Sequence, residues 1–340
     1  MKREVKRGKK RILFVDIAKG IAIILMILGH VVEHGVVRNA IFSFHMPLFL
    51  ITSGFFYKNR TFKDELKNVF LRLLLPTFVV LFVVNLISGL NTKDLFTAFF
   101  NAVKVIIGGS TQSTKIVFDF GSVGVCWFIY LLVGVRLLFN INKKIAKDND
   151  LLLGLIVLVE TLAGYLLGIN GYWMAWVVDI ALVGIVFYFA GYILNKYNIL
   201  KKICSSKISL LLLLVIWVVG IKYAPIELAI RSYPCGFWCI IVAIAGSITV
   251  LKISMLIEKY LKYSAKVLAW AGKNSLYILY GHYVEEVLLI SPNYPAVSMK
   301  MLKILETLFK LTFSILFAVL VLGYGKLKTK LLKQPQCNKK

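Results

Sequence analysis

The chain has 340 residues, 59% of them hydrophobic, and a mean hydropathy of +0.81. Soluble domains hold roughly 45–50% apolar residues, so this composition excludes an ordinary soluble protein. The formal net charge of +25 suggests nucleic-acid binding, but the cations lie in short segments between apolar runs and at both ends. Because cytoplasmic loops retain positive charge in this way, we expect an all-α polytopic integral membrane protein that contacts membrane lipid and no nucleic acid.

The sequence predicts a chain that crosses the bilayer about ten times, because apolar runs of about 20 residues, the length that spans a hydrocarbon core, recur throughout. The predicted spans are 12–35, 39–57, 70–89, 123–141, 150–168, 174–195, 207–223, 234–257, 268–290 and 304–323. The predicted organisation is a basic cytoplasmic N-terminal segment, 1–11, a membrane domain, 12–323, and a basic cytoplasmic tail, 324–340.

The unequal distribution of Lys and Arg predicts the orientation. If the N-terminus is inside, the cytoplasmic segments hold 29 of these residues and the opposite segments hold 8. This bias places both termini in the cytoplasm, and an even number of spans agrees. The N-terminal segment resembles a secretory signal but lacks a small-residue cleavage site, so we expect a retained first helix. In the external segment 90–122, residues 94–107 are expected to form a helix in the membrane interface.

The first predicted span carries an unusual number of ionisable side chains. They are Asp16, Lys19, His30, Glu33 and His34. At about 100° per residue, the first four fall on one side of a helix. That stripe has to face other helices or a water-filled cavity, because lipid does not tolerate it. In an alternative interpretation, Lys19 snorkels to the inner surface and His30 is an interfacial residue.

The remaining histidines are predicted to lie at a similar depth. His45 opens the second span after a short connection, and His282 lies about 21 Å into the ninth span at 1.5 Å per residue. His30 and His45 are therefore expected to be close together. His45 is either a hydrogen-bonding partner or a catalyst, and the sequence leaves both interpretations open.

Basic residues crowd the predicted cytoplasmic connection into the third span. They are Lys58, Arg60, Lys63, Lys67 and Arg72. The cluster predicts either ordinary positive-inside charge or a site for a phosphate-bearing ligand, in which Arg72 makes a bidentate contact. Lys273, at the start of the ninth span, is expected to contribute to the same site.

Two acids inside predicted spans, Glu160 and Asp179, are expected either to orient a histidine or to pair with a cation. The five cysteines include no CxxC pair and lie in mostly apolar surroundings. Packing thiols are therefore expected, and no metal site.

Several short motifs occur in a characteristic order along the predicted spans. They are Asp16-x-x-Lys19-Gly20 with Gly29-His30, Phe44-His45-Met46-Pro47-Leu48-Phe49 with Ser53-Gly54-Phe55, Arg72-x-x-x-Pro76, Trp127-Phe128, Asp179-x-Ala181-Leu182 with Phe187-Tyr188-x-x-Gly191, and Gly272-x-Asn274-Ser275-Leu276 with His282. Each motif alone is weak, but their order is fairly specific. The chain resembles the membrane acyltransferase-three family over essentially its whole length, and its closest likeness is to the fucose 4-O-acetylase-like branch.

This resemblance implies a multi-pass enzyme of the bacterial plasma membrane. It implies transfer of an acetyl group from cytoplasmic acetyl-CoA to a hydroxyl of a cell-surface or lipid-linked carbohydrate. His30 would be the catalytic histidine and Lys19 its basic partner, where many members carry Arg; Lys keeps the charge but loses bidentate geometry. Some relatives carry an added extracytoplasmic domain that does not occur in this sequence, so either the acceptor reaches the membrane domain or a separate protein completes the transfer.

Histidine suits this chemistry because its unperturbed pKa lies near neutrality. Either His30 deprotonates the acceptor hydroxyl directly, with Glu33 or His45 fixing its tautomer, or an acyl-histidine intermediate forms. The expected contacts of acetyl-CoA are Lys19, Arg72 and Lys273. The expected acceptor contacts and oxyanion donors are Asp16, Ser53, Trp127, Asp179, Asn274, Ser275, Tyr277 and His282.

A different class of protein also has about ten spans and buried charges, namely a secondary transporter or exporter of a glycan or lipid-linked substrate. The sequence shows no paired halves and no matching Gly- or Pro-broken helices, which disfavours this alternative. A membrane sensor is a third class. Association with further copies of the same chain is left open.

Overall fold

The computed structural model describes residues 12–32, 34–90, 94–111, 120–288 and 299–332. Within these ranges it contains helices and no β-strand, which confirms the predicted all-α fold. The helices are α1 (Leu13–Val31), α2 (Val36–Phe42), α3 (His45–Phe55), α4 (Phe62–Val69), α5 (Leu75–Leu90), α6 (Leu95–Gly108), α7 (Trp127–Ile145), α8 (Asp150–Ile169), α9 (Val178–Lys196), α10 (Ile199–Ser205), α11 (Lys207–Tyr223), α12 (Trp238–Tyr260), α13 (Lys262–Lys273), α14 (Ser275–Leu288) and α15 (Met299–Leu332), with short turns η1 (Phe70–Leu74), η2 (Gly124–Cys126), η3 (Ala175–Val177) and η4 (Leu228–Ile230).

Eight helical segments of the described chain are long and apolar enough to cross a membrane, and counting the bent pair α10 and α11 as one span gives nine. The chain is therefore a polytopic membrane protein. The seventh predicted span coincides with α11, which follows α10 at an angle of 96°. The second predicted span consists of α2 and α3, with a break just before His45.

The ninth predicted span, 268–290, differs from the single helix that we expected. Helix α13 ends at Lys273 and α14 begins at Ser275. Asn274 lies between them, where its backbone N–H is 3.1 Å from the Trp270 carbonyl oxygen and its side-chain amide donates to the same oxygen at 2.8 Å. The Asn274 side chain thus adds a second hydrogen bond to one of the terminal carbonyls of α13, where the intrahelical pattern leaves acceptors in need of partners.

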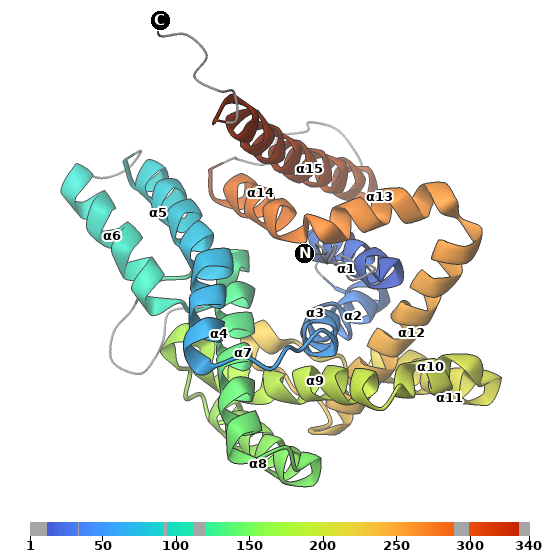
Figure 1. Ribbon diagram of the computed structural model, residues 1–340. Coiled ribbons are helices and arrows are strands. Elements are labelled where there is room, and N and C mark those ends of the chain that lie inside the picture. The colour runs from blue at the N-terminus through green and yellow to red at the C-terminus, as the bar shows by residue number, and fades with distance from the viewer. Residues whose placement is uncertain (1–11, 33, 91–93, 112–119, 289–298, 333–340) are drawn as a thin grey trace, which may run out of the picture.

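Helices α1 and α3 lie at the centre of the bundle. Helix α1 packs against α3, α12, α13, α14 and α15, and α3 packs against α9. Figure 1 shows α1, α2 and α3 surrounded by α7 to α9 on one side and α12 to α15 on another, with α5 and α6 at the periphery. Asp16 of α1 is buried at this centre, as the prediction of an inward polar stripe requires.

Glycines allow the central helices to touch at backbone distance. A Cβ atom at Gly20 would lie 2.0 Å from the Leu268 carbonyl oxygen, and one at Gly272 would lie 1.8 Å from the backbone of α1. Helices α3 and α9 meet in the same way, because a Cβ atom at Gly54 or Gly191 would lie 1.9 Å from a carbonyl oxygen of the other helix. Small residues of this kind permit close helix packing in membranes, and they fix α1 against α13 and α3 against α9.

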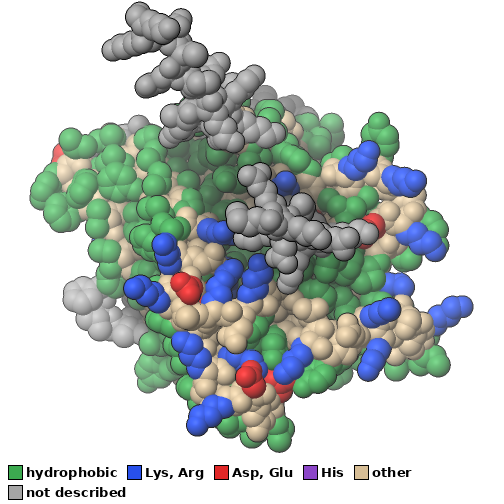
Figure 2. Space-filling model, in the orientation of Figure 1, with side chains coloured by type: hydrophobic (Ala, Val, Ile, Leu, Met, Phe, Trp, Pro, Cys, Tyr) green, Lys and Arg blue, Asp and Glu red, His purple; other side chains and the backbone are tan. Residues whose placement is uncertain are grey.

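The peripheral helices expose large apolar side chains. Examples are Val79 of α5, Phe96 of α6, Val159 of α8, Leu212 of α11 and Leu320 of α15. Figure 2 shows Lys and Arg side chains gathered over one face of the molecule, with hydrophobic side chains around them. A protein in water would not expose this much apolar surface, so these helices are the ones that face lipid.

Candidate active site

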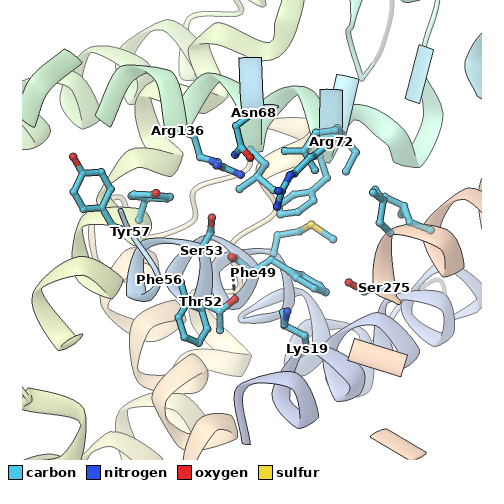
Figure 3. Close-up of a pocket in the computed structure, with 18 of the residues that line it drawn as sticks. Lys19, Phe49, Thr52, Ser53, Phe56, Tyr57, Asn68, Arg72, Arg136 and Ser275 are labelled. Atoms are coloured by element: carbon cyan, nitrogen blue, oxygen red, sulfur yellow. Dashed lines mark hydrogen bonds between the residues drawn. The ribbon is translucent and has the colours of Figure 1, made fainter. Parts of the chain in front are cut away.

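A cavity of about 420 Å³ lies between α1, α3, α4, α7 and α14. We call it the basic cavity, because its lining includes five cations and one carboxylate: Lys19, Lys58, Arg60, Arg72, Arg136 and Glu65. Figure 3 shows Arg72, Arg136 and Asn68 on one side of this cavity, with Lys19 and Ser53 on the other. Three distant parts of the sequence, helix α1, the connection into the third span and helix α7, thus supply one concentration of positive charge.

Glu65 organises the cations on the α4 side. Thr61 caps α4 by accepting a hydrogen bond from the Asp64 N–H at 3.1 Å, which starts the helix one turn before Glu65. The buried Glu65 carboxylate accepts hydrogen bonds from Arg60 Nη1 at 2.7 Å and from Arg136 Nε at 2.8 Å. The pairing holds both guanidinium groups in fixed positions at the cavity wall.

Arg72 is placed by an irregular turn. It lies on η1, a π-helical segment between α4 and α5, and such segments are frequent at functional sites. Within the described part of the chain, no carboxylate or hydrogen-bond acceptor pairs with Arg72, although the side chain lines the cavity. Its donors are therefore available to a ligand.

Lys19 lines the opposite wall. Its Nζ lies 3.2 Å from Asp16 Oδ1, one turn earlier on α1, and Asp16 itself does not line the cavity. Ser53 of α3 and Ser275 of α14 add hydroxyl groups to the same lining. The structure brings several of the residues predicted from sequence into one cavity, namely Lys19, Ser53, Lys58, Arg60, Arg72 and Ser275.

A second cavity of about 350 Å³ lies at the other end of α1. Three of the four histidines of the protein, His30, His34 and His45, line it, and we call it the histidine cavity. His30 is exposed, and its accessible side chain faces this space. Trp127, the first residue of α7, forms part of the wall.

Phe42 lies between the two histidines that we expected to be close. Its ring centroid is 6.2 Å from that of His30 and 4.9 Å from that of His45. The His45 ring donates from Nδ1 to the Ile41 carbonyl oxygen at 2.9 Å, which leaves Nε2 as an acceptor in the neutral ring. His30 and His45 therefore share the cavity, with Phe42 in contact with both.

His282 packs against His30 in the interior of the protein. It is fully buried and is absent from the lining of either cavity, but its ring centroid is 5.3 Å from that of His30. Its Nδ1 lies 3.2 Å from Glu285 Oε2, and Glu285 Oε1 lies 3.5 Å from Lys310 Nζ. The four histidines are therefore gathered in one region, as their predicted depths indicated.

The two cavities adjoin. Met46 of α3 lines both, and the consecutive residues Trp127 and Phe128 line the histidine cavity and the basic cavity, respectively. Along α1, Lys19 and His30 are eleven residues apart, which is about 16 Å of helix. One helix thus connects a cationic space to a histidine-lined space, with Met46 at the boundary.

Other predicted residues lie elsewhere. Lys273 is exposed at the end of α13, while Asn274 and Tyr277 line neither cavity. Asp179 is buried in an ion pair with Arg231, with 2.7 Å between Oδ2 and Nε, which resolves the alternatives for this acid in favour of a cation. Glu33 lies outside the described residues. Glu160, the other acid inside a predicted span, accepts a hydrogen bond from the Asn142 amide at 2.6 Å.

Several residues in or near the two cavities were not predicted from the sequence. Arg136 and Lys310 are cations inside predicted spans, and that signal alone was sufficient to single them out. Asn68, Arg38 and Glu227 had no such signal, because they lie in or near connecting segments where polar residues are ordinary. Arg38 Nη2 and Glu227 Oε1 form an ion pair of 2.8 Å in the lining of the histidine cavity.

Comparison with known proteins agrees with this architecture. A family described as an acyltransferase domain matches residues 12–323, the same range as the predicted membrane domain. No curated protein and no solved structure matches the chain, and assignment to the fucose 4-O-acetylase-like branch stays a prediction. The match covers most of the chain and includes every residue that lines either cavity. The chain therefore belongs to the membrane acyltransferase-three family and is a multi-pass membrane acyltransferase.

Proposed function

We propose that the protein transfers an acetyl group from cytoplasmic acetyl-CoA to a hydroxyl of a cell-surface or lipid-linked carbohydrate. The observation that carries this proposal is the pair of adjoining cavities with different chemistry, one cationic and one lined by histidines, which share Met46. Group transfer requires that two substrates reach one point in a defined geometry. The boundary at Met46 is where a donor and an acceptor, each in its own cavity, would meet.

The basic cavity suits the donor. Its five cations against one carboxylate leave an excess of positive charge for the phosphates of CoA. Arg72 offers a planar guanidinium group of the kind that binds phosphate in a bidentate manner. Arg136, whose Nε and Nη2 donate to Glu65, adds positive charge and its remaining Nη1 group. Apolar side chains of the same cavity, including Ile23, Phe49 and Leu279, are suited to the thioester end of the pantetheine arm.

The histidine cavity suits the acceptor. It combines aromatic side chains, Phe42 and Trp127, with a few polar groups, which is the usual composition of a site for a small organic ligand. His30 is exposed to this space and is the residue that the proposal places in contact with the acceptor hydroxyl.

In the proposed reaction, His30 accepts the proton of the acceptor hydroxyl while the hydroxyl oxygen attacks the thioester carbonyl. A carbon–oxygen bond forms, the carbon–sulfur bond breaks, and the proton passes from His30 to the departing CoA thiolate. An acyl-histidine intermediate reaches the same products in two steps. Rapid quenching with labelled acetyl-CoA distinguishes these routes, because only the second leaves the label on the protein.

The predicted orientation gives this reaction a direction. With both termini in the cytoplasm, Lys58 and Arg72 belong to the cytoplasmic side and His34 to the opposite side. The acetyl group would then travel along α1 from the cytoplasmic face of the plasma membrane toward an acceptor on the other face. The proposed reaction therefore moves the acetyl group across the membrane as well as from CoA to the carbohydrate.

The test uses the purified protein in lipid nanodiscs. Acetyl-CoA is supplied with methyl glycosides of fucose, glucose or N-acetylglucosamine, and free thiol and acetylated sugar are measured together. The proposal expects thiol release that depends on the sugar and an equal amount of O-acetyl product. Acetyl-CoA that is neither bound nor consumed would contradict it, and uptake of an unmodified labelled glycan by proteoliposomes would favour the transporter.

A further inference from the structure

A chain of buried ionisable groups runs from α15 to His30. Lys310 Nζ of α15 lies 3.5 Å from Glu285 Oε1 and 3.4 Å from Glu306 Oε1. The other oxygen of Glu285 lies 3.2 Å from His282 Nδ1, and the His282 ring packs edge-on against His30 at 5.3 Å between centroids. The arrangement crosses three helices, α15, α14 and α1.

Burial makes this chain unusual. His282 and Glu285 are 0% and 1% exposed, and the Lys310 side chain is 12% exposed. A charged group costs several kcal/mol to bury unless it is paired, and ionisable residues inside a membrane are by default functional. A second carboxylate, Glu306, lies at the more exposed end of the chain.

The contact with Glu285 determines which nitrogen of His282 carries the proton. A carboxylate accepts hydrogen bonds, so Nδ1 is the donor and Nε2 is the acceptor of the neutral ring. Within the described part of the chain, this buried Nε2 has no hydrogen-bond partner. An unpaired buried nitrogen is costly, and this one belongs to a ring that contacts the ring of His30, so we take its retention to be functional.

We propose that His282, Glu285 and Lys310 form a positioning relay for His30. The inference rests on the proposed function, in which His30 holds a proton between its removal from the acceptor hydroxyl and its delivery to the CoA thiolate. The Glu285 charge, acting through the His282 ring that it orients, stabilises the imidazolium of His30 during that interval. In a catalytic triad the buried carboxylate bonds to the catalytic histidine directly, whereas here one further ring lies between them. Lys310 holds the carboxylate in place.

These three residues act through His30 and touch neither substrate, because none of them lines a cavity. Two other ionisable groups lie near His30, Arg38 on α2 and His45 on α3. Arg38 stacks on Phe42 and pairs with Glu227, and His45 is bonded to a backbone carbonyl. Among the described residues, Glu285 is therefore the carboxylate that can act on His30, and it does so through the ring of His282.

The test compares two carboxylates bound to the same lysine. Glu285→Gln keeps the size and an acceptor for His282 Nδ1 but removes the charge, and it is expected to lower kcat about 10–100-fold, the usual effect of losing an outer partner of a reacting group. The KM values for acetyl-CoA and for the methyl glycoside that supports turnover are expected to change less than about twofold. Glu306→Gln, the matched control, keeps kcat within about twofold.

A second pair of variants separates positioning from packing. Lys310→Met is expected to lower kcat about tenfold and Lys310→Arg to restore most of it, because Arg keeps the charge beside Glu285. Thermal unfolding of each variant in nanodiscs is measured in parallel and is expected to match wild type for Glu285→Gln. Unchanged kcat for Glu285→Gln, or an equal loss in Glu306→Gln, would overturn the relay.

The two proposals fail in different ways. If wild-type protein releases no thiol from acetyl-CoA in the presence of any glycoside, the proposed function is wrong and the relay falls with it. If wild type and Glu306→Gln turn over and Glu285→Gln turns over equally, the function stands and the relay is wrong. A fall in kcat together with a rise in both KM values and a lower unfolding temperature would show a structural role and would also overturn the relay.

Discussion

The basic cavity and the histidine cavity are of comparable size, about 420 and 350 Å³, and share helix α1 and Met46, but they differ in charge. The first contains five cations, two of which are held by Glu65. The second contains a single ion pair, Arg38 with Glu227, together with three histidines. In the proposed function, attraction of an anion and transfer of a proton therefore take place in separate spaces.

This separation follows from chemistry. A cation next to a proton-accepting histidine opposes its protonation, because like charges repel. Lys19 of the basic cavity lies about 16 Å from His30, a distance that helix α1 fixes. The two cations that do lie near His30, Arg38 and Lys310, are each paired with a carboxylate, Glu227 and Glu285, respectively. The comparison predicts that variants on each side alter different kinetic constants.

The largest expected effect comes from His30→Ala. Loss of a general base typically lowers turnover about 10²–10⁴-fold, so kcat in the nanodisc assay should fall by at least a hundredfold with little change in unfolding temperature. His34→Ala is the matched control in the same cavity and should lose much less. Activity above about a tenth of wild type in His30→Ala would remove His30 from the mechanism.

Arg72→Gln should weaken the basic cavity and leave the histidine cavity unchanged. A hydrogen bond to a charged group contributes about 1.5–3 kcal/mol, so the KM for acetyl-CoA should rise roughly tenfold or more while the acceptor KM stays constant. Lys273→Gln, which removes an exposed cation outside the cavity lining, serves as the control and should be nearly silent. A rise in the acceptor KM alone would place the donor elsewhere.

Gly20→Ala tests the helix that both cavities share. Its Cβ would lie 2.0 Å from the Leu268 carbonyl oxygen, so α1 has to move away from α13, and overpacking of this kind typically costs about 1–3 kcal/mol. Both KM values and the unfolding temperature should change together. Gly323→Ala, where the added methyl meets no atom within 4 Å, should be neutral in the same thermal-unfolding and kinetic measurements.

The smallest expected effect is that of Glu227→Gln. The pair with Arg38 is partly exposed, with side chains 16% and 26% accessible, and such pairs contribute about 0–1 kcal/mol. The acceptor KM should therefore change by less than about fivefold and the acetyl-CoA KM not at all. A hundredfold loss of kcat would instead place Glu227 in the chemistry, contrary to the division between the two cavities.

Much of this organisation could be predicted from sequence, because the bilayer restricts what buried polar residues can do. The stripe on α1 had to face protein, and the short connection before His45 had to bring it near His30. The spans followed from apolar runs, apart from the breaks just before His45 and at Asn274. At Asn274 a local side-chain hydrogen bond to the Trp270 carbonyl accompanies the break, and a hydrophobicity pattern does not encode such a contact.

What the sequence could not supply are pairings between distant helices. Asp179 pairs with Arg231, 52 positions away, and Glu65 binds Arg136, 71 positions away. Each acid had several potential partners in the sequence, and the choice depends on how α4 packs on α7 and how the segment before α12 folds back. The contact of Glu285 with Lys310 was hidden for the same reason, although a lysine inside the last span was itself a signal.

The central claim is that the two cavities open to opposite sides of the membrane and hold different substrates. It is tested most directly in a cysteine-free background with single cysteines at Lys58 and His34, which are both exposed and line the basic and the histidine cavity, respectively. An impermeant thiol reagent should label His34→Cys in intact cells and Lys58→Cys only after lysis, and acetyl-CoA should protect Lys58→Cys alone. Labelling of both from one side, or protection of His34→Cys instead, would contradict the account.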